Sequence, residues 1–435
     1  MRDIAVVGAG PTGLYLSVAL ARRGHRVTLV DRDPGPGPDG WERRGVMQFH
    51  HPHGLRQQVV EALDAELPDA HQALLAAGAK DVRLRNGLAV GLHCRRAVLE
   101  RVLHRMAEEQ EGVTVVEGHA EDVVREHDRV TGVRVDGRTL DAGLVLDAGG
   151  RGSRLGQDLR PAADDQDCGL AYVSRHHAFQ PGATPGPLTD AAGLLEQHRG
   201  YLVATFLQDS GTFATLILRE SGDHELGRLR EAEAYATACA AIPGLAAWTD
   251  PARSRPITAP RAGANVRNTY RGQGARPGLI HVGDAVCATN PVAGRGIATS
   301  LMQAQRLLAD LDEHEDLADA RDAFDAWCTR EIRPWFDDHV RSDPDQLARR
   351  RGVDVPLDRP LTSGWITETM AVAPELRRTI VLFLAMRKSP ADLMAIEPAA
   401  REIYAGGWRP AAPAGPGRDE LVQLIKGSRG SSVTV

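Results

Sequence analysis

The first thirty-one residues constrain the fold more tightly than any other stretch of the chain. An apolar run at residues 4–7 leads into a glycine-rich turn, Gly8-Ala9-Gly10-Pro11-Thr12-Gly13, and residues 14–23 then carry apolar side chains at helical spacing. A second apolar run at 26–30 ends in Asp31. Because a strand, a glycine turn, a helix, a strand and an acid follow in this order, the stretch predicts a βαβ unit that binds a dinucleotide.

The residue types in this unit each suit a dinucleotide. Gly8 permits the tight turn, Gly10 lets the backbone approach a pyrophosphate, and Gly13 lets the helix pack closely on the strand. Free N–H groups at the start of the helix face the phosphates. Asp31 can accept hydrogen bonds from ribose hydroxyls and would repel a 2′-phosphate, so its position favours NAD or FAD over NADP.

Composition excludes several classes of protein. The 435 residues are enough for two or three domains, and the net charge of −6 gives no sign of nucleic-acid binding. The longest apolar run, 380–386, is too short to span a membrane. The five cysteines lack CxxC spacing, which indicates reduced thiols without a metal or disulfide framework. Because a strand begins at the start of the chain, we expect no signal peptide and a cytoplasmic protein.

Patterning along the chain predicts an α/β fold in five segments. Residues 170–179 and 201–218 read as strands of an inserted sheet, with a turn at Asp209-Ser210-Gly211, whereas the C-terminal third is mostly helical. The predicted segments are the nucleotide-binding domain in two parts (1–165 and 270–345), a substrate-binding sheet domain (166–269), a helical region (346–408) and a loose tail (409–435).

Within these segments the sequence predicts further elements. Residues 95–110 have the spacing of an amphipathic helix, and strands at 122–126, 130–135 and 144–147 read as a meander. Prolines are expected to break the C-terminal helices, and they stand at Pro334, Pro344, Pro356 and Pro390.

Three separated motifs carry a family resemblance. They are Gly8-x-Gly10-x-x-Gly13, Asp147-Ala148-Gly149-Gly150-Arg151-Gly152-Ser153, and Gly283-Asp284 followed by Asn290-Pro-Val-Ala-Gly294-Arg295-Gly296. In this order and at these spacings, residues 1–310 resemble the FAD-dependent monooxygenases of the para-hydroxybenzoate hydroxylase superfamily (group A). The chain is most similar to the bacterial branch of epoxidases, hydroxylases and geranylgeranyl-reductase-like proteins, where Arg44-Gly-Val-x-Gln48 is also familiar.

The resemblance implies an FAD-binding domain of the glutathione-reductase type, and a monooxygenase that hydroxylates or epoxidises a small organic substrate. In that superfamily reduced FAD and O2 form a flavin C4a-hydroperoxide, with NAD(P)H as a transient electron donor. A role in secondary metabolism, such as antibiotic biosynthesis, is implied in the same way.

The resemblance also assigns residues to the cofactor. Asp284 would hold a ribityl hydroxyl of FAD, and the helix start at Gly294, Arg295, Gly296 and Ile297 would stabilise the charge of the reduced flavin. Arg96, with Arg95 as its neighbour, matches the arginine that reaches the pyrophosphate. The remaining FAD contacts are expected from Gly8, Gly10, Pro11, Thr12, Gly13, Asp31, Arg32, Arg44 and Ala120. Arg44 and Arg295 are the candidate catalytic residues on the flavin side.

Two positions depart from the usual motifs. Gly149 stands where the second motif normally has an acid, and that acid often assists NAD(P)H use as well as FAD binding. This departure makes a separate flavin reductase an alternative electron source to a nicotinamide bound by this chain. Arg295 stands where glutamine is commoner, which would place a cation near the flavin or near an anionic substrate.

Several alternatives stay open on the sequence alone. The chain could be an FAD-dependent reductase or dehydrogenase of an unsaturated, prenyl-like substrate, or a flavin-binding subunit without turnover. A plain NAD dehydrogenase would leave Asp284 without a ligand. Flavin halogenases share the fold and need a lysine, for which Lys80 is the candidate, but their Trp-x-Trp-x-Ile-Pro signature is missing. His50, His51 and His53 lack a cysteine or carboxylate partner in sequence, so we predict no metal site.

Overall fold

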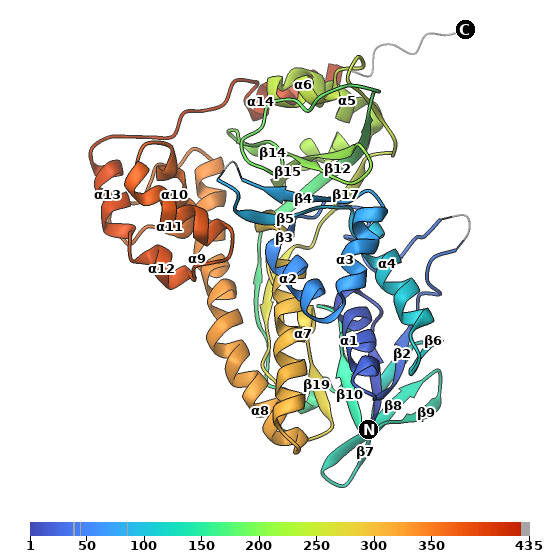
Figure 1. Ribbon diagram of the computed structural model, residues 1–435. Helices are drawn as coiled ribbons and strands as arrows, with labels where there is room; N and C mark the ends of the chain where they lie inside the picture. Colours follow the sequence, from blue (N-terminus) through green and yellow to red (C-terminus); the bar gives the residue numbers. More distant parts are fainter. Residues whose placement is uncertain (38–39, 44, 85, 428–435) are drawn as a thin grey trace.

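The computed structural model describes residues 1–37, 40–43, 45–84 and 86–427. Figure 1 shows three parts: a parallel sheet with its helices, an antiparallel sheet domain at one end, and a helical region along one side. The architecture confirms the predicted α/β class, with a Rossmann-like core, further antiparallel sheets and C-terminal helices.

The core is a five-stranded parallel sheet in the order β19-β10-β1-β2-β6. Its strands are β1 (Asp3–Val7), β2 (Arg26–Asp31), β6 (Val113–Glu117), β10 (Leu144–Asp147) and β19 (Leu279–His281). Side chains alternate between its faces, so that Ile4 and Val6 pack against the helices whereas Ala5 packs on the other side. The helices are α1 (Pro11–Arg22), α4 (Arg96–Glu109) and α7 (Gly296–Glu313).

An antiparallel meander covers the opposite face of this sheet. It consists of β7 (Ala120–Glu126), β8 (Arg129–Val135) and β9 (Arg138–Asp141). The prediction that 144–147 forms the third meander strand was wrong, because this segment is β10 and pairs with β1 and β19 in the parallel sheet. All four residues of β10 are buried, as expected of a strand with both faces covered, whereas the polar β9 is the edge strand of the meander.

The inserted sheet has the order β13-β14-β15-β12-β16, and β17 also pairs with β12. Its strands are β12 (Leu170–Phe179), β13 (Leu195–Gln197), β14 (Tyr201–Leu207), β15 (Thr212–Glu220), β16 (Ser254–Pro256) and β17 (Arg261–Gly263). One face packs on α5 (Ala232–Ala241) and α6 (Pro243–Thr249) through Phe213, Ile217 and Tyr201. The other face is turned toward the nucleotide-binding part.

Two small sheets join these parts. One contains β11 (Asp164–Asp167), β18 (Arg267–Tyr270) and β20 (Cys287–Ala288), and the other contains β3 (Leu55–Arg56), β4 (Lys80–Arg83) and β5 (Ala89–His93). Helices α2 (Gln57–Glu66) and α3 (Pro68–Ala76) lie between β3 and β4. Short turns of helix are η1 (Gln157–Leu159), η2 (Leu226–Arg230), η3 (Gly283–Ala285), η4 (Pro291–Ala293), η5 (Cys328–Ile332) and η6 (Thr369–Ala371).

The C-terminal region is helical, as predicted. Its helices are α8 (Leu317–Trp327), α9 (Arg333–Arg350), α10 (Ser363–Glu368), α11 (Pro374–Leu384), α12 (Pro390–Met394) and α13 (Glu397–Ala405). The predicted break at Pro344 was wrong, because this proline lies inside α9. Ser342, Asp343 and Asp345 are buried on either side of it, and their packing holds the helix across the hydrogen bond that proline cannot donate.

The segment after Trp408 differs from the loose tail that the sequence predicted. Residues 418–427 form α14 (Arg418–Gly427), which packs beside α5 at the outer side of the sheet domain (Figure 1). Leu421, Val422 and Ile425 are buried there in the same apolar cluster as the sheet. The Gly- and Pro-rich stretch before α14 hides the signal of this short amphipathic helix.

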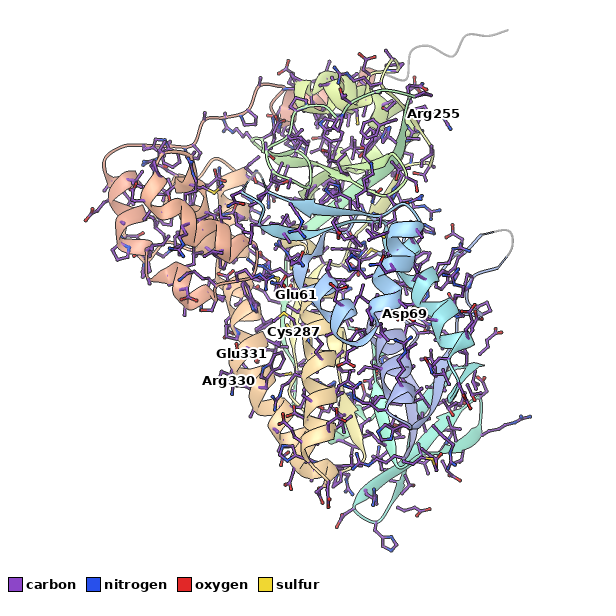
Figure 2. All side chains as sticks on the ribbon, viewed as in Figure 1. Glu61, Asp69, Arg255, Cys287, Arg330 and Glu331 are labelled. Atoms are coloured by element: carbon purple, nitrogen blue, oxygen red, sulfur yellow. The ribbon has the colours of Figure 1, made fainter. Side chains whose placement is uncertain are left out.

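All five cysteines are buried, and none of them forms a disulfide. Cys287 can be located among the packed side chains in Figure 2. Burial raises the pKa of the Cys287 thiol well above its ordinary value, which keeps it protonated. Among the residues that the structure describes, no helix combines the length and the apolar character needed to cross a membrane.

Candidate cofactor and active site

One large cavity joins the ends of the parallel strands to the inner face of the antiparallel sheet. Its volume is about 1240 Å³, which exceeds that of most single-ligand pockets. Cofactor residues predicted from the sequence that line it are Gly8, Gly10, Pro11, Thr12, Asp31, Arg32, Arg96, Ala120, Asp284, Gly294, Gly296 and Ile297. The fold therefore brings residues from six separate stretches of the chain to one cavity.

The glycine turn leaves no room for side chains where the cofactor fold needs close approach. Gly8 has a φ of 104°, and a Cβ there would lie 2.5 Å from the carbonyl oxygen of Ala148. A Cβ on Gly13 would lie 1.8 Å from the carbonyl oxygen of Gly8, so this glycine packs the helix onto the turn and does not itself line the cavity. Gly10 faces open space, as a backbone that approaches a pyrophosphate requires.

Asp31 is held at the end of β2 by three donors, one of which is the backbone N–H of Asp33, 2.9 Å from Oδ1. Its Oδ2 accepts a hydrogen bond from the backbone N–H of Ala9 at 2.5 Å and from Nη2 of Arg43 at 2.7 Å. The sequence assigned the flavin-side arginine of this loop to Arg44, which lies outside the described residues. Its neighbour Arg43 is buried, lines the cavity and also donates to the carbonyl oxygen of Ala9 at 2.8 Å.

The two arginines at the start of α4 have different surroundings. Arg96 lines the cavity and forms an ion pair with Glu100 one helical turn further on. Arg95 instead pairs with the buried carboxylate of Asp209, which lies in the turn between β14 and β15. Of the two sequence candidates, Arg96 is therefore the one that faces the cavity, whereas Arg95 ties α4 to the sheet domain.

Asp284 lies in η3 directly after β19 and lines the cavity. Its carboxylate accepts a hydrogen bond from Ser300 Oγ at 3.2 Å, and burial raises its pKa above the ordinary value despite the nearby Arg96. A half-buried carboxylate with so few donors suits a ligand that brings hydroxyl groups of its own. The ribityl chain of FAD has this chemistry, so the residues present fit the cofactor.

The helix start opposite Asp284 presents backbone to the cavity. Gly294 has a left-handed conformation with φ of 60°, and Gly296 and Ile297 open α7 beside it. N–H groups at a helix start are unpaired by the helix itself and carry partial positive charge, so this segment suits an anionic ring.

The side chain of Arg295 does not line the cavity. Its guanidinium lies 4.5 Å from the ring centre of Trp335 and 4.9 Å from that of Phe383, with Nη1 3.3 Å from Asp338. It is 4% exposed and anchors the start of α7 to α9 and α11. A flavin-side contribution at this position would therefore come from the backbone rather than from the charge that the sequence suggested.

The second motif owes its shape to Asp147, the last residue of β10. Its carboxylate accepts hydrogen bonds from His281 Nδ1 at 2.7 Å, from the N–H of Gly149 at 2.9 Å and from Ser153 Oγ at 2.8 Å. Although burial opposes its charge, these donors hold the pKa of Asp147 below its ordinary value. The turn from Gly149 to Ser153 then lines the cavity.

The sheet domain supplies an apolar wall. Side chains of one sheet face and of the segment before β18 line the cavity, and they are Tyr172, Leu202, Ala204, Phe206, Leu216, Leu218 and Val266. His51 and His53 stand at the border between this wall and the cofactor part, and burial lowers the pKa of His51 to about 4 and that of His53 to about 3. Both imidazoles are therefore neutral at pH 7.

His51 is fixed by the sheet. Its Nδ1 lies 2.7 Å from Ser174 Oγ, and its ring packs against Tyr172 in an edge-to-face manner. His53 Nδ1 lies 2.9 Å from the carbonyl oxygen of His51, so this nitrogen carries the proton and Nε2 is left as an acceptor.

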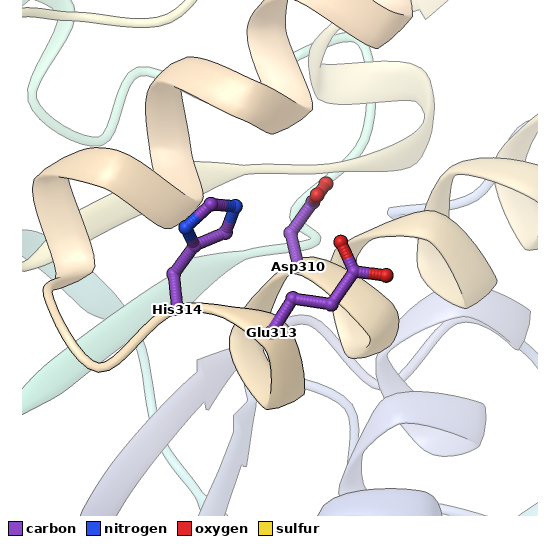
Figure 3. Close-up of side chains that lie close together, drawn as sticks. All are labelled: Asp310, Glu313 and His314. Atoms are coloured by element: carbon purple, nitrogen blue, oxygen red, sulfur yellow. The ribbon is translucent and has the colours of Figure 1, made fainter.

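Potential metal ligands occur together at the C-terminal end of α7. Asp310, Glu313 and His314 lie close to one another in Figure 3. Arg306 binds both carboxylates, forming an ion pair with Asp310 and a contact of 3.4 Å with Glu313. None of these three residues lines the cavity, and both carboxylates already contact an arginine.

Sequence reasoning missed Arg43, Arg56 and Glu100. Arg43 stands beside Arg44 in a loop without periodicity, so nothing in the sequence distinguishes the two. Glu100 follows Arg96 by four residues, which is the spacing of an ion pair on a helix and could have been recognised. Arg56 contacts residues more than two hundred positions away, so no local signal exists for it.

Comparison with known proteins shows which families and folds the chain resembles. Residues 3–156 match the model of the FAD dependent oxidoreductase family. A dihydropyrimidine dehydrogenase subunit, PreT of Escherichia coli, is 41% identical over 64 residues, but this match spans 15% of the chain and only 13% of PreT. A putative 2-heptyl-3-hydroxy-4(1H)-quinolone synthase, AqdB1 of Rhodococcus erythropolis, is 26% identical over 72% of the chain and 81% of its own length.

Solved structures share the whole fold. The flavin-dependent brominase Bmp2 superimposes with a TM-score of 0.65 at 16% identity, covering 94% of this chain and all of that one. PqsL of Pseudomonas aeruginosa, described as a probable FAD-dependent monooxygenase, gives a TM-score of 0.58 at 17% identity over 80% of this chain and 98% of its own. The family match is confined to residues 3–156, and it supports an FAD-dependent oxidoreductase.

Proposed function

We propose that the protein is an FAD-dependent monooxygenase that hydroxylates or epoxidises a small organic substrate. One observation carries this proposal: a single cavity connects the cofactor-binding turn and Asp284 with the apolar face of the inserted sheet. A substrate on that face would lie beside the flavin and against an apolar wall. The similarity to AqdB1 and the fold shared with PqsL support the same reaction class.

One set of cavity residues would bind FAD, and another set would orient the substrate. Bound FAD would supply the oxygen chemistry once it is reduced. Asp31 and Arg96 would hold its ribose and pyrophosphate, Asp284 its ribityl chain, and the N–H groups from Arg295 to Ile297 its pyrimidine end. The apolar wall would orient the substrate, and the neutral His53 can accept a hydrogen bond from a hydroxyl group without adding charge.

Halogenation receives less support, although halogenases share the fold. The chain has three lysines, Lys80, Lys388 and Lys426, all within the described part of the chain, and none of them lines the cavity. Lys80 is exposed at the start of β4. A halogenase lysine between flavin and substrate would therefore have no counterpart at these positions.

Anaerobic stopped-flow spectroscopy tests the proposal. The FAD-loaded protein is mixed with NADPH or NADH and then with O2, and flavin absorbance and oxygen consumption are recorded. We expect oxygen consumption by the reduced protein, with hydrogen peroxide released when no substrate is present. Reduction by a nicotinamide would assign the donor, whereas reduction only by dithionite would assign a partner reductase, as Gly149 suggests. A reduced protein that is stable in O2 would contradict a monooxygenase.

A further inference from the structure

A buried carboxylate lies behind the cofactor wall of the cavity. Glu100, on α4, is fully buried and does not line the cavity itself. Its Oε2 accepts a hydrogen bond from Nη1 of Arg43 at 2.6 Å, and its Oε1 pairs with Nε of Arg96. Each oxygen is thus engaged by a different arginine, and both arginines line the cavity.

The two arginines point toward opposite parts of the cofactor site. Arg43 reaches Asp31 and the carbonyl oxygen of Ala9, at the ribose end of the βαβ unit. The charge of Arg96 acts on Asp284 and on His53, which lie farther along the cavity. Glu100 connects the two groups, so one carboxylate sets the distance between two cations that face the ligand.

A buried charge of this kind destabilises the fold unless its hydrogen-bond partners compensate for the loss of hydration. Taking a carboxylate out of water costs several kcal/mol, and two charge-assisted hydrogen bonds are what make the position tolerable. Among the described residues, Glu100 is the carboxylate with which Arg96 forms an ion pair. Without that charge Arg96 would lose its fixed rotamer, and Arg43 would be left to Asp31 and Asp33.

We propose that Glu100 is a positioning residue for the cofactor, which acts by fixing Arg43 and Arg96 around its adenosine and pyrophosphate groups. The proposal rests on the assignment of this cavity to FAD. It predicts a selective effect: ligands with a pyrophosphate depend on Glu100, whereas a ligand that carries only the isoalloxazine and ribityl groups does not.

Calorimetric titration of the ligand-free, full-length protein tests this selectivity with ADP and riboflavin as probes. Glu100→Gln keeps the shape of the side chain and removes its charge. We expect its ADP affinity to fall at least about tenfold, which corresponds to about 1.4 kcal/mol, while riboflavin affinity changes less than about twofold. Glu108→Gln is the matched control, because Glu108 lies on the same helix but is exposed. It should bind both probes like the parent protein.

A double-mutant cycle checks the route of the effect. Arg96→Met should weaken ADP binding by itself, and its loss should be smaller in the Glu100→Gln background, because the arginine is then already misplaced. If Glu100→Gln does not fold, Glu100→Asp retains the charge but is too short to reach both arginines. That variant should fold and should still lose ADP affinity selectively.

The possible results distinguish a failure of the positioning role of Glu100 from a failure of the FAD assignment. Equal ADP affinity in Glu100→Gln and the parent protein would overturn the positioning role and leave the FAD site intact. Equal losses of ADP and riboflavin would show a merely structural carboxylate and would also overturn it. A parent protein that binds neither FAD nor ADP would overturn the cofactor assignment and this inference together.

Discussion

Arg56 donates a hydrogen bond from Nε to the carbonyl oxygen of Gly294 at 3.0 Å, although 238 residues separate them in the chain. The same guanidinium also bonds the carbonyl oxygens of Ala293 and Leu384. One side chain therefore ties β3 to the loop before α7 and to the end of α11. Arg56 therefore links the C-terminal helices to the loop at Gly294, which we assign to flavin binding.

Replacing Arg56 should loosen this junction. In Arg56→Gln, carbonyl groups lose a charged donor, and we expect the free energy of unfolding to fall by about 2 kcal/mol. FAD affinity should fall about tenfold, because the loop that ends at Gly294 is no longer held. Denaturant unfolding and FAD titration measure the two effects. Arg83→Gln, an exposed change on β4 of the same small sheet, should alter neither, and equal behaviour of the two variants would contradict the role of Arg56.

Asp284 is expected to lower the stability of the ligand-free protein and to strengthen its binding of FAD. Its pKa is raised by burial in the ligand-free protein, so the folded state holds the proton more tightly than the unfolded chain does. The contribution of Asp284 to stability is therefore lost as pH rises through its ordinary value toward the raised one. Asp284→Asn removes this penalty, and its melting temperature without FAD should exceed that of the parent protein by a margin that grows as pH rises above the ordinary aspartate pKa and then levels off.

The same substitution should weaken FAD binding. An amide accepts hydrogen bonds from ribityl hydroxyls less strongly than a carboxylate does. Asp284→Ala should bind FAD still more weakly, and fluorescence titration gives both affinities. If Asp284→Asn is less stable than the parent protein without FAD, or binds FAD equally well, the assignment of this carboxylate fails.

The helix at the end of the described chain should contribute to folding. Ile425 is fully buried in the core of the sheet domain, whereas its neighbour Leu424 is 41% exposed. Ile425→Ala should lower the free energy of unfolding by about 2–4 kcal/mol, and Leu424→Ala should change it by less than about 0.5 kcal/mol. Denaturant unfolding measures both. Similar values for the two variants would show that α14 does not dock in solution.

Local patterns predicted many of the residues that line the cavity. The turn from Gly8 to Gly13 and the strand that ends at Asp31 were recognisable because each residue type serves a local requirement of the backbone. Asp284 and Gly294 were recognisable only together with the earlier motifs. Residues 144–147 were placed in the wrong sheet, because the apolar pattern of a strand does not indicate which strands it pairs with.

Contacts between distant segments could not be predicted from the sequence. Arg295 reads as a flavin-side cation in sequence, but Trp335 and Phe383 draw its guanidinium into the C-terminal helices. The environment of Arg56 likewise depends on residues far along the chain. Such positions are fixed by packing between parts of the fold, and no periodicity in the local sequence encodes them.

Titration of the ligand-free protein with FAD, followed by the change in flavin fluorescence, is the most direct test of the cavity as the cofactor site. We expect saturable binding of one FAD per chain, competition by ADP, and a loss of affinity of at least about tenfold in Asp284→Ala. The absence of saturable binding, or an Asp284→Ala variant that binds FAD like the parent protein, would contradict the site described above.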